Sequence, residues 1–444
     1  MPTPREQQHT EWKESWRDEY FKSVCGFANA QGGYLYIGQD DRGRITGLPP
    51  AECRRLLEIL PNQARDLLGI VPAVNHHVEQ GHEYLELVVE SYPYPISYRG
   101  RYYFRSGSTT QELRGAALDA FLLQKQGRHW DGVPMPGVTS TELSVATLDL
   151  FRARADRSGR VDAGVLLDSN EVLLENLNLT DSHYLKRAAV LLFHPQPEKF
   201  VSGAYVKLGY FVTDDDLRYQ DEVHGPLLLQ VEHTLALLRS KYLPPAITYQ
   251  DGARVEQTVY PEAALREALL NALAHKDYSS GTPIQISVYA THLLFWNDGQ
   301  LPERWTVEHL QRKHPSKPFN PDIANTLFRA GYIESWGRGT LSMLAECRTR
   351  QLPAPQFTFD ATGCTVQFFA DPAAYFRSRG LREEFIQLLL FAQRQRNVTN
   401  KAVQQLLGVS KATATRYLAE LEQQGYLLKT GTTGVGTSYS LKDS

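Results

Sequence analysis

The spacing of apolar residues changes character several times along the chain of 444 residues. In the segment EYFKSVCGFANA the apolar residues recur at helical spacing, which predicts a helix that Gly32 and Gly33 end. The dense apolar run YLYIG predicts a strand, and CRRLLEILPNQARDLL predicts a second helix. The runs HEYLELVVE and RYYFRSG predict further strands. Residues 1–125 are therefore predicted to form a first α/β domain.

The middle of the chain begins with a break in this pattern. Residues 126–141 are rich in Gly and Pro and have no period, which is typical of a linker. A central α/β domain is expected over residues 142–250, with AAVLLFH and AYVKLGYFV as strands and PLLLQVEHTLALLRSKY as a helix. A separate region is expected over residues 251–372, with the long helix PEAALREALLNALAHKDY, the strand pair IQISVYATHLLFWNDGQ and a hairpin in LPAPQFTFDATGCTVQFFA. The predicted fold class is thus multidomain α+β.

The last 64 residues, 381–444, carry the clearest local pattern. EEFIQLLLFAQRQ predicts an amphipathic helix. Thr399 is expected to cap a short helix and Ser410 a longer one, with Ala414, Leu418 and Leu421 on one face of the second. The run LLKTGTTGVGTSYSL predicts two short strands around a Gly/Thr tip. The order helix, turn, helix, β-wing predicts a winged helix-turn-helix.

A winged helix of this kind places its second helix in a DNA major groove. Residues 381–444 hold 8 Lys/Arg and 5 Asp/Glu, a local net charge of +3, which suits a phosphate backbone. A winged helix also serves as a protein–protein or dimerisation module, and the sequence leaves this alternative open. The residues predicted to contact DNA are Lys411, Thr413, Thr415 and Arg416 on the helix and Lys429 in the wing.

Overall composition narrows the classes of function. The formal net charge of −3 gives no general basic field, so any nucleic-acid contact must come from a local patch. The four cysteines lie far apart and form no CxxC motif, which excludes a disulfide framework and fits a reducing cytosol. The chain contains no run of about 18 apolar residues, the length that spans a bilayer. A cytoplasmic protein without a membrane span is expected.

The helix predicted near residue 270 carries polar residues on one face. Glu267 and Asn271 are four residues apart, and His275 follows one turn later. A carboxylate and an amide stacked in this way can orient a water molecule and hold Mg²⁺ against a triphosphate. Glycines further along, in WNDGQLP and ESWGRGT, could bring backbone N–H groups close to a base or to phosphates. The simpler alternative is that Glu267 and Asn271 only cover a structural helix.

These segments resemble the GHKL (Bergerat-fold) ATPases. The resemblance is to the divergent form found in bacterial ATP-binding transcriptional regulators that are described as helicase-related. The resemblance is carried by LLNALAHKDYS, NDGQLP and PFNPDIANTLFRAGYIESWGRG, and it implies an α/β sandwich that binds ATP with Mg²⁺. It implies that Asn271 coordinates Mg²⁺ and Glu267 positions the attacking water. The position of the family's adenine-reading aspartate is Asn297 here. The other residues predicted to bind nucleotide are His275, Asp298, Gly299, Gly337, Arg338, Gly339 and Thr340.

The N-terminal segment offers a second set of charged residues. Glu11 and Lys13 are two apart, so on a strand they face the same way. Glu6 and Glu11 are five apart, which places them on one face of neither a helix nor a strand, and a metal site would need a bend between them. Spacing alone therefore does not establish a metal site.

The first 125 residues resemble the Schlafen AlbA-type domain through EWKES, VCGFANAQGGYLYIGQDDRGRITGL and YYFRSGSTT. In nuclease members two glutamates and an aspartate hold a divalent metal, which implies Glu6, Glu11 and Asp40 here, with Lys13 nearby and Mg²⁺ or Mn²⁺ as the ion. A binding-only alternative uses basic and aromatic residues as phosphate contacts and stacking faces. A third alternative is that the aromatic residues pack their own sheet. The residues of the binding-only alternative are Lys13, Arg42, Arg99, Arg101, Arg105, Tyr92, Tyr94, Tyr98, Tyr102 and Tyr103.

Together these patterns predict a DNA-binding transcriptional regulator whose activity is modulated by ATP. The alternative is a Schlafen-like metal-dependent nuclease that acts on RNA or single-stranded DNA, with a role in defence. An assembly protein whose domains serve as interfaces is a third interpretation. The sequence leaves enzymatic activity open between a weak ATPase and the nuclease. A homo-oligomer is expected if the tail reads a palindrome, because half-site symmetry mirrors protein symmetry.

Overall fold

The computed structural model describes residues 7–250, 253–302, 305–334, 337–395, 397–430 and 437–442, without the side chains of Ala116 and of residues 246–257. The chain divides into two compact units, Met1–Trp130 and Asp131–Ser444. The division falls inside the segment 126–141 that the sequence indicates as a linker. Within the described ranges, no helix combines the length and the apolar character needed to cross a membrane.

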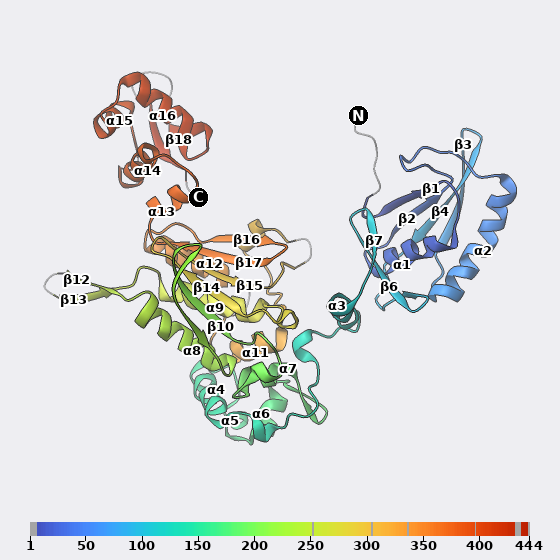
Figure 1. Cartoon of the computed structure of the whole chain (residues 1–444), viewed down its shortest axis with the longest axis horizontal. Coiled ribbons are helices and arrows are strands. Elements are labelled where there is room, and N and C mark those ends of the chain that lie inside the picture. Colours follow the sequence, from blue (N-terminus) through green and yellow to red (C-terminus); the bar gives the residue numbers. More distant parts are fainter. Residues whose placement is uncertain are drawn as a thin grey trace. The chain divides into compact units, whose positions relative to one another are not determined.

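The first unit is built on a four-stranded sheet with the order β1-β2-β4-β3 (Figure 1). The pair β1–β2 is parallel and the other two pairs are antiparallel. Leu35 and Ile37 of β2 and Leu85 and Leu87 of β4 share one fully buried face, which forms one core with two helices. The elements are β1 (Thr10–Lys13), α1 (Phe21–Asn29), β2 (Gly33–Ile37), α2 (Pro50–Leu68), β3 (Ala73–Glu79) and β4 (His82–Val89).

A small three-stranded sheet completes the first unit and is tied to α1. The buried side chain of Asn29, at the end of α1, donates from Nδ2 to the carbonyls of Ile96 and Tyr103, each at 2.8 Å, and its Oδ1 accepts from the Ile96 amide at 2.8 Å. One amide thereby bonds three backbone groups of the segment 96–103, and the carbonyl of Ile96 also accepts from Sγ of Cys25 at 3.3 Å. The elements here are β5 (Ser97–Tyr98), β6 (Arg101–Ser106), β7 (Thr109–Glu112) and α3 (Gly115–Lys125).

The second unit contains a six-stranded sheet with the order β11-β10-β14-β15-β17-β16. The pair β10–β14 is parallel and the others are antiparallel. Strands from 142–250 and from 251–372 therefore lie in one sheet, so the predicted domain boundary at residue 250 does not separate two cores. The strands are β10 (Val206–Thr213), β11 (Asp216–Val223), β14 (Ile284–Val288), β15 (His292–Asn297), β16 (Gln356–Asp360) and β17 (Gly363–Phe369), and the hairpin β12 (Ala246–Gln250)–β13 (Ala253–Gln257) lies apart from them.

Helix α9 (Glu262–His275) is the central helix of this unit, and eight of its residues are buried. It contacts α12 (Gly339–Thr349), α8 (Leu227–Leu237) and β15 (Figure 1). This burial fixes the direction of the polar residues on its remaining face. The other helices of the unit before residue 372 are α4 (Val145–Ser158), α5 (Ala163–Leu167), α6 (Asn170–Asn176), α7 (Arg187–Phe193), α10 (Val307–Leu310) and α11 (Pro321–Arg329), and a short β8 (Thr180–Asp181)–β9 (Tyr184–Leu185) pair lies between α6 and α7.

The prediction of a strand in AAVLLFH is wrong, because this segment forms helix α7. Each residue from 188 to 193 is fully buried. A continuous apolar run of this length has no polar face to reveal its period, so a buried helix and a buried strand look alike in the sequence.

The end of the chain forms the predicted winged helix-turn-helix around its own core. Thr399 caps the second helix by accepting from the amide of Ala402, and Ser410 caps the third by accepting from the amide of Thr413. Ala414, Leu418 and Leu421 are buried, as their spacing predicts. The wing tip, residues 431–436, lies outside the described residues. The elements are α13 (Pro372–Ser378), α14 (Glu383–Gln395), α15 (Asn400–Leu407), α16 (Lys411–Gln423), β18 (Leu427–Thr430) and β19 (Ser438–Leu441).

Candidate functional site

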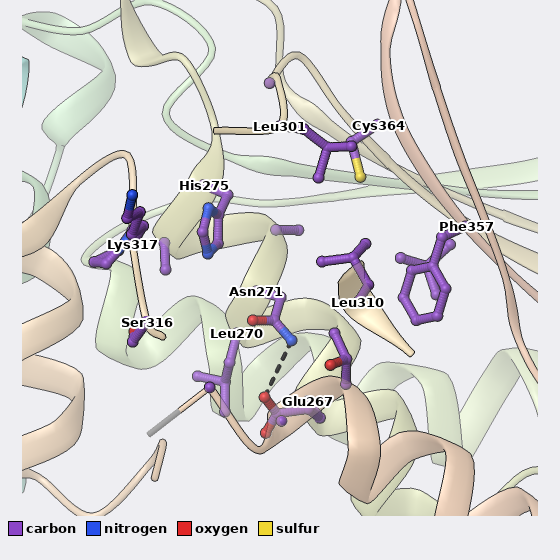
Figure 2. A pocket seen from close by; sticks show the side chains of 18 of the residues that line it. Glu267, Leu270, Asn271, His275, Leu301, Leu310, Ser316, Lys317, Phe357 and Cys364 are labelled. Atoms are coloured by element: carbon purple, nitrogen blue, oxygen red, sulfur yellow. Dashed lines mark hydrogen bonds between the residues drawn. The ribbon is translucent and has the colours of Figure 1, made fainter. Parts of the chain in front are cut away.

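Helix α9 forms one wall of a cavity of about 120 Å³ that opens to solvent. Glu267, Asn271 and His275, one turn apart from each other, all line this cavity (Figure 2). Asn271 donates from Nδ2 to Oε1 of Glu267 at 3.0 Å, so its carbonyl oxygen remains available as an acceptor. The helical spacing thus brings these three residues to one place, while their role in binding a ligand stays a prediction.

Three glycines line the cavity, two of them against α9 and one against the loop between α10 and α11. A Cβ at Gly299 would lie 2.7 Å from the carbonyl oxygen of His275. A Cβ at Gly337, whose φ is +59°, would overlap the carbonyl oxygen of His314, and one at Gly339 would overlap the carboxylate of Glu267. Only glycine fits these positions without displacing a neighbour. The three glycines therefore keep the cavity open beside α9.

The cavity disfavours charge on Glu267 and on His275. Loss of hydration raises the pKa of Glu267, the hydrogen bond from Asn271 and the charge of Arg266 oppose this, and Glu334 adds to it. Loss of hydration, with a smaller contribution from His314, lowers the pKa of His275 to about 4. The imidazole is therefore neutral at pH 7, and Glu267 holds a proton more readily than an exposed glutamate does.

The amide of Asn297 is the least satisfied polar group of the cavity wall. Asn297 ends β15, is 4% exposed and lines the cavity. Its Nδ2 finds no hydrogen-bond partner within the described residues. A buried donor without a partner costs roughly 1–3 kcal/mol, so this amide would gain from a ligand that accepts a hydrogen bond.

Two residues predicted to bind nucleotide do not line the cavity. Asp298 follows Asn297 with its side chain elsewhere, and its carbonyl oxygen accepts from the amide of Asp277 at 2.6 Å. Arg338 is exposed beside the cavity. Asn297 is the last residue of β15, and Asp298 follows it in a bend outside the strand. The remaining predicted residues, Gly299, Gly337, Gly339 and Thr340, line it together with Glu267, Asn271 and His275.

The loop between α10 and α11 also lines the cavity, and its residues were not among those predicted from the sequence. His314 bonds through Nε2 to the hydroxyl of Thr340 at 3.2 Å, and Lys317 is exposed at the cavity wall (Figure 2). The signal that could have found them is the cationic stretch QRKHPSK, directly before the segment that carries the family resemblance. A lysine here adds a positive charge to a cavity whose α9 wall is neutral or acidic.

The donor set of the cavity fits a nucleotide with Mg²⁺. Mg²⁺ takes oxygen ligands and keeps several waters, so one or two protein oxygens beside phosphate oxygens suffice. Asn271 offers its carbonyl oxygen, and Glu267 is within hydrogen-bond distance of Asn271. The oxygen atoms present therefore suit Mg²⁺. Asn271 would bind the ion directly, and Glu267 would bind it through a water molecule.

In the first unit, the carboxylate of Glu11 forms ion pairs with Arg105 and Lys13. Its Oε2 lies 2.5 Å from Nη1 of Arg105, and its Oε1 lies 3.1 Å from Nζ of Lys13 and 3.0 Å from the hydroxyl of Ser23. Arg105 is 1% exposed and also donates to the carbonyls of Gln7 and Thr10. A metal ion at Glu11 would have to displace this buried guanidinium.

Asp40 forms an ion pair with a different arginine, Arg44. It pairs with Arg44 at 2.6 Å and accepts from the amides of Arg42 and Arg44 at 2.9 Å each. The Arg44 hydrogen bonds lower the pKa of Asp40. Glu6 lies outside the described residues, so the predicted set of Glu6, Glu11 and Asp40 stays a prediction.

Several residues of the binding-only alternative are buried in the structure. Arg105 is buried against Glu11, and Tyr98 and Tyr103 are 3% and 7% exposed in the core of the first unit, so they do not offer contacts to phosphate or to bases. These aromatic residues pack their own sheet, as the third alternative expects. The residues of this set that remain exposed are Arg42, Tyr94, Arg99 and Arg101.

On the winged helix, the predicted DNA contacts fall into two groups. Lys411, Arg416 and Lys429 are exposed. Thr413 is half-buried and bonds the hydroxyl of Ser410 at 3.0 Å, and Thr415 accepts from Nδ2 of Asn400 at 2.8 Å. The two threonines thus help to hold the turn and the helix pair together. The ion pairs in the described part of this domain, Arg377–Glu383 and Arg382–Glu420, leave out the three cationic side chains.

Three family models match separate parts of the chain. The Schlafen AlbA_2 model matches residues 6–114, and the IclR helix-turn-helix model matches residues 388–431. The model described as "Putative ATP-dependent DNA helicase recG C-terminal", of the HATPase type, matches residues 281–368. This last match begins after α9, so Glu267 and Asn271 lie outside it. No curated protein matches the chain.

Among the solved structures that are similar to the chain are the following two. The DIP2311 protein of Corynebacterium diphtheriae is 19% identical with a TM-score of 0.47, over 98% of this chain and 92% of that one. The N-terminal domain of a RecG-related protein of Nitrosomonas europaea, titled a putative ATP-dependent DNA helicase, is 26% identical with a TM-score of 0.19, over 23% of this chain and 80% of that one. The family matches establish the order of domains: the chain carries a Schlafen AlbA_2 domain, an ATPase-like domain and a C-terminal helix-turn-helix domain.

Proposed function

We propose that the chain is a DNA-binding regulator whose affinity for DNA depends on ATP held with Mg²⁺ in the cavity beside α9. The observation that carries this proposal is the convergence of Glu267, Asn271 and the unpartnered amide of Asn297 on one cavity. The ATPase-like and helix-turn-helix matches support the two halves of the proposal separately.

Each side of the cavity has a role in the proposed binding. Asn271 would hold the Mg²⁺ ion through its carbonyl oxygen, and the ion would supply positive charge to the phosphates. The exposed Lys317 adds a cation, and the backbone at Gly337 and Gly339 approaches the phosphates where a side chain would collide. Asn297 donates its buried amide to a ring acceptor of the base.

Glu267 is suited to handle a proton. Its pKa is raised by loss of hydration, and a general base works best with a pKa near the working pH. Its hydrogen bond to Asn271 fixes the carboxylate beside the proposed Mg²⁺ ligand. Hydrolysis would use Glu267 to orient and deprotonate the attacking water. Binding without hydrolysis remains sufficient for regulation.

The test is equilibrium dialysis of labelled ATP with Mg²⁺ against the full chain, with phosphate release measured in the same samples. Asn271→Ala should weaken ATP binding at least about tenfold, because it removes the Mg²⁺ ligand and frees Glu267. Glu267→Gln should keep binding and lose phosphate release. A parallel series with GTP measures how strictly Asn297 selects the base.

The control is Asn176→Ala, which removes an exposed amide from α6 outside the cavity. It should bind ATP as the wild-type chain does. Wild-type chain without measurable affinity for either nucleotide, or equal binding by wild type and Asn271→Ala, would contradict the proposed site.

A further inference from the structure

Three residues with metal-binding side chains converge in the first unit, outside the sites described above. One ligand atom each of Cys53, His76 and Glu83 lies within 4.8 Å of the other two. No other trio of His, Cys, Asp or Glu in the described part of the chain is arranged in this way. The three residues come from α2, β3 and β4, so the fold brings them together across 30 positions of sequence.

The strand register explains why two of these side chains meet. In the antiparallel pair β3–β4, His76 lies opposite Leu85 and Val78 opposite Glu83. His76 and Glu83 are therefore diagonal neighbours on the same face as the fully buried Leu85. His77 points to the other face, where it stacks on Tyr84. Helix α2 packs on the His76 face and supplies the third residue, Cys53, which is fully buried.

The distances and the chemistry suit one borderline-soft divalent ion. Nε2 of His76 and Oε2 of Glu83 form a hydrogen bond at 3.1 Å, and this separation is also close to that of two ligands on a tetrahedral ion with bonds of about 2.0–2.1 Å. Thiolate, imidazole and carboxylate are the three ligand types that Zn²⁺ takes in proteins. A thiolate and a carboxylate would balance its two positive charges.

We propose that Cys53, His76 and Glu83 bind one Zn²⁺ ion, with the fourth position open to water. On binding, the thiol of Cys53 gives its proton to solvent and a sulfur–zinc bond forms. Cys53 is buried while His76 and Glu83 are partly exposed, so the ion would enter from the solvent side and leave its open position there. Such an ion would clamp α2 to the β3–β4 edge of the sheet.

This site is separate from the predicted carboxylate set. In the sheet order β1-β2-β4-β3, Glu11 on β1 and His76 on β3 stand at opposite edges. The zinc site therefore adds an ion to the first unit without requiring Glu11 to release Arg105. Either site can be tested without disturbing the other.

The test uses the full chain after removal of metal with a chelator. Co²⁺ serves as the coloured probe, and Zn²⁺ is then titrated in competition. Wild-type chain should bind one equivalent and show a sulfur-to-cobalt charge-transfer band. Cys53→Ser should lose this band, and His76→Gln and Glu83→Gln should each weaken Zn²⁺ binding at least about tenfold. The matched control, His77→Gln on the opposite face of β3, should bind as the wild type does.

Zn²⁺ should also raise the unfolding temperature of the wild-type chain, since a ligand that binds only the folded state stabilises it. Glu83→Gln preserves the shape of the side chain, so its result stands even if Cys53→Ser folds poorly. A wild-type chain that binds no Co²⁺ or Zn²⁺ would overturn the proposal. A charge-transfer band retained in Cys53→Ser would also overturn it, because the thiolate would then come from Cys25, Cys347 or Cys364.

Discussion

Replacing Arg105 by methionine should destabilise the first unit by about 3–5 kcal/mol, the usual cost of leaving one partner of a buried ion pair without the other. Arg105 is 1% exposed and pairs with Glu11, which is 6% exposed. The same guanidinium satisfies the carbonyls of Gln7 and Thr10. Its removal therefore leaves Glu11 with Lys13 as its remaining cation, and it takes one hydrogen bond from each of the two carbonyls. Hydrogen exchange of peptides from α1 and β6 measures the loss within the full chain.

The matched control is Arg101→Met on the same strand. Arg101 is exposed, and its pair with Glu112 at 3.4 Å is a surface pair worth about 0–1 kcal/mol. The double variant Arg105→Met with Glu11→Leu should recover part of the lost stability, because it also removes the buried carboxylate that Arg105 neutralises. Equal protection from exchange in Arg105→Met and Arg101→Met would show that the buried pair does not hold this unit together.

Removing Lys411 and Arg416 together, as the double alanine variant, should weaken DNA binding at least about tenfold at low salt. Both side chains are exposed on α16. Each cation that no longer neutralises a phosphate lowers the magnitude of the slope of log K against log salt by about 0.9. The slope should therefore fall in magnitude by about 2. Fluorescence anisotropy of a labelled duplex, measured over a series of salt concentrations, gives both quantities.

The control for charge is Lys199→Ala with Arg218→Ala, two exposed cations of the second unit outside 381–444. This variant has the same net charge and should keep the wild-type slope. An unchanged slope in the Lys411/Arg416 variant would favour the alternative in which the winged helix is a protein–protein module.

Local features of the fold were predictable because they depend on neighbours in sequence. Thr399 and Ser410 cap their helices by accepting from an amide three residues later, so the chain itself shows the signal. Glu267, Asn271 and His275 line one cavity because helical spacing puts them on one face. The prediction of a strand at α7 was wrong because this helix is buried on all sides, so its apolar run shows no helical period.

Other features depend on contacts between distant segments, which spacing does not reveal. Arg105 reaches Glu11 across 94 positions, so a residue expected to touch phosphate is a core residue. Cys53, His76 and Glu83 show no motif in sequence, because a helix and a strand pair bring them together. Asn297 rather than Asp298 faces the cavity because of the direction of a single side chain in β15.

We propose above all that the binding of ATP and the binding of DNA are linked. This linkage is measured most directly with a DNA duplex that the chain itself has selected from a random pool. Its affinity is determined with and without saturating ATP and Mg²⁺, for the wild type and for Asn271→Ala. ATP should change the dissociation constant of the wild type at least about fivefold, and the duplex should change ATP affinity by the same factor. Asn271→Ala should bind the duplex equally in both conditions. A wild-type affinity for DNA that does not respond to bound ATP would contradict the claim.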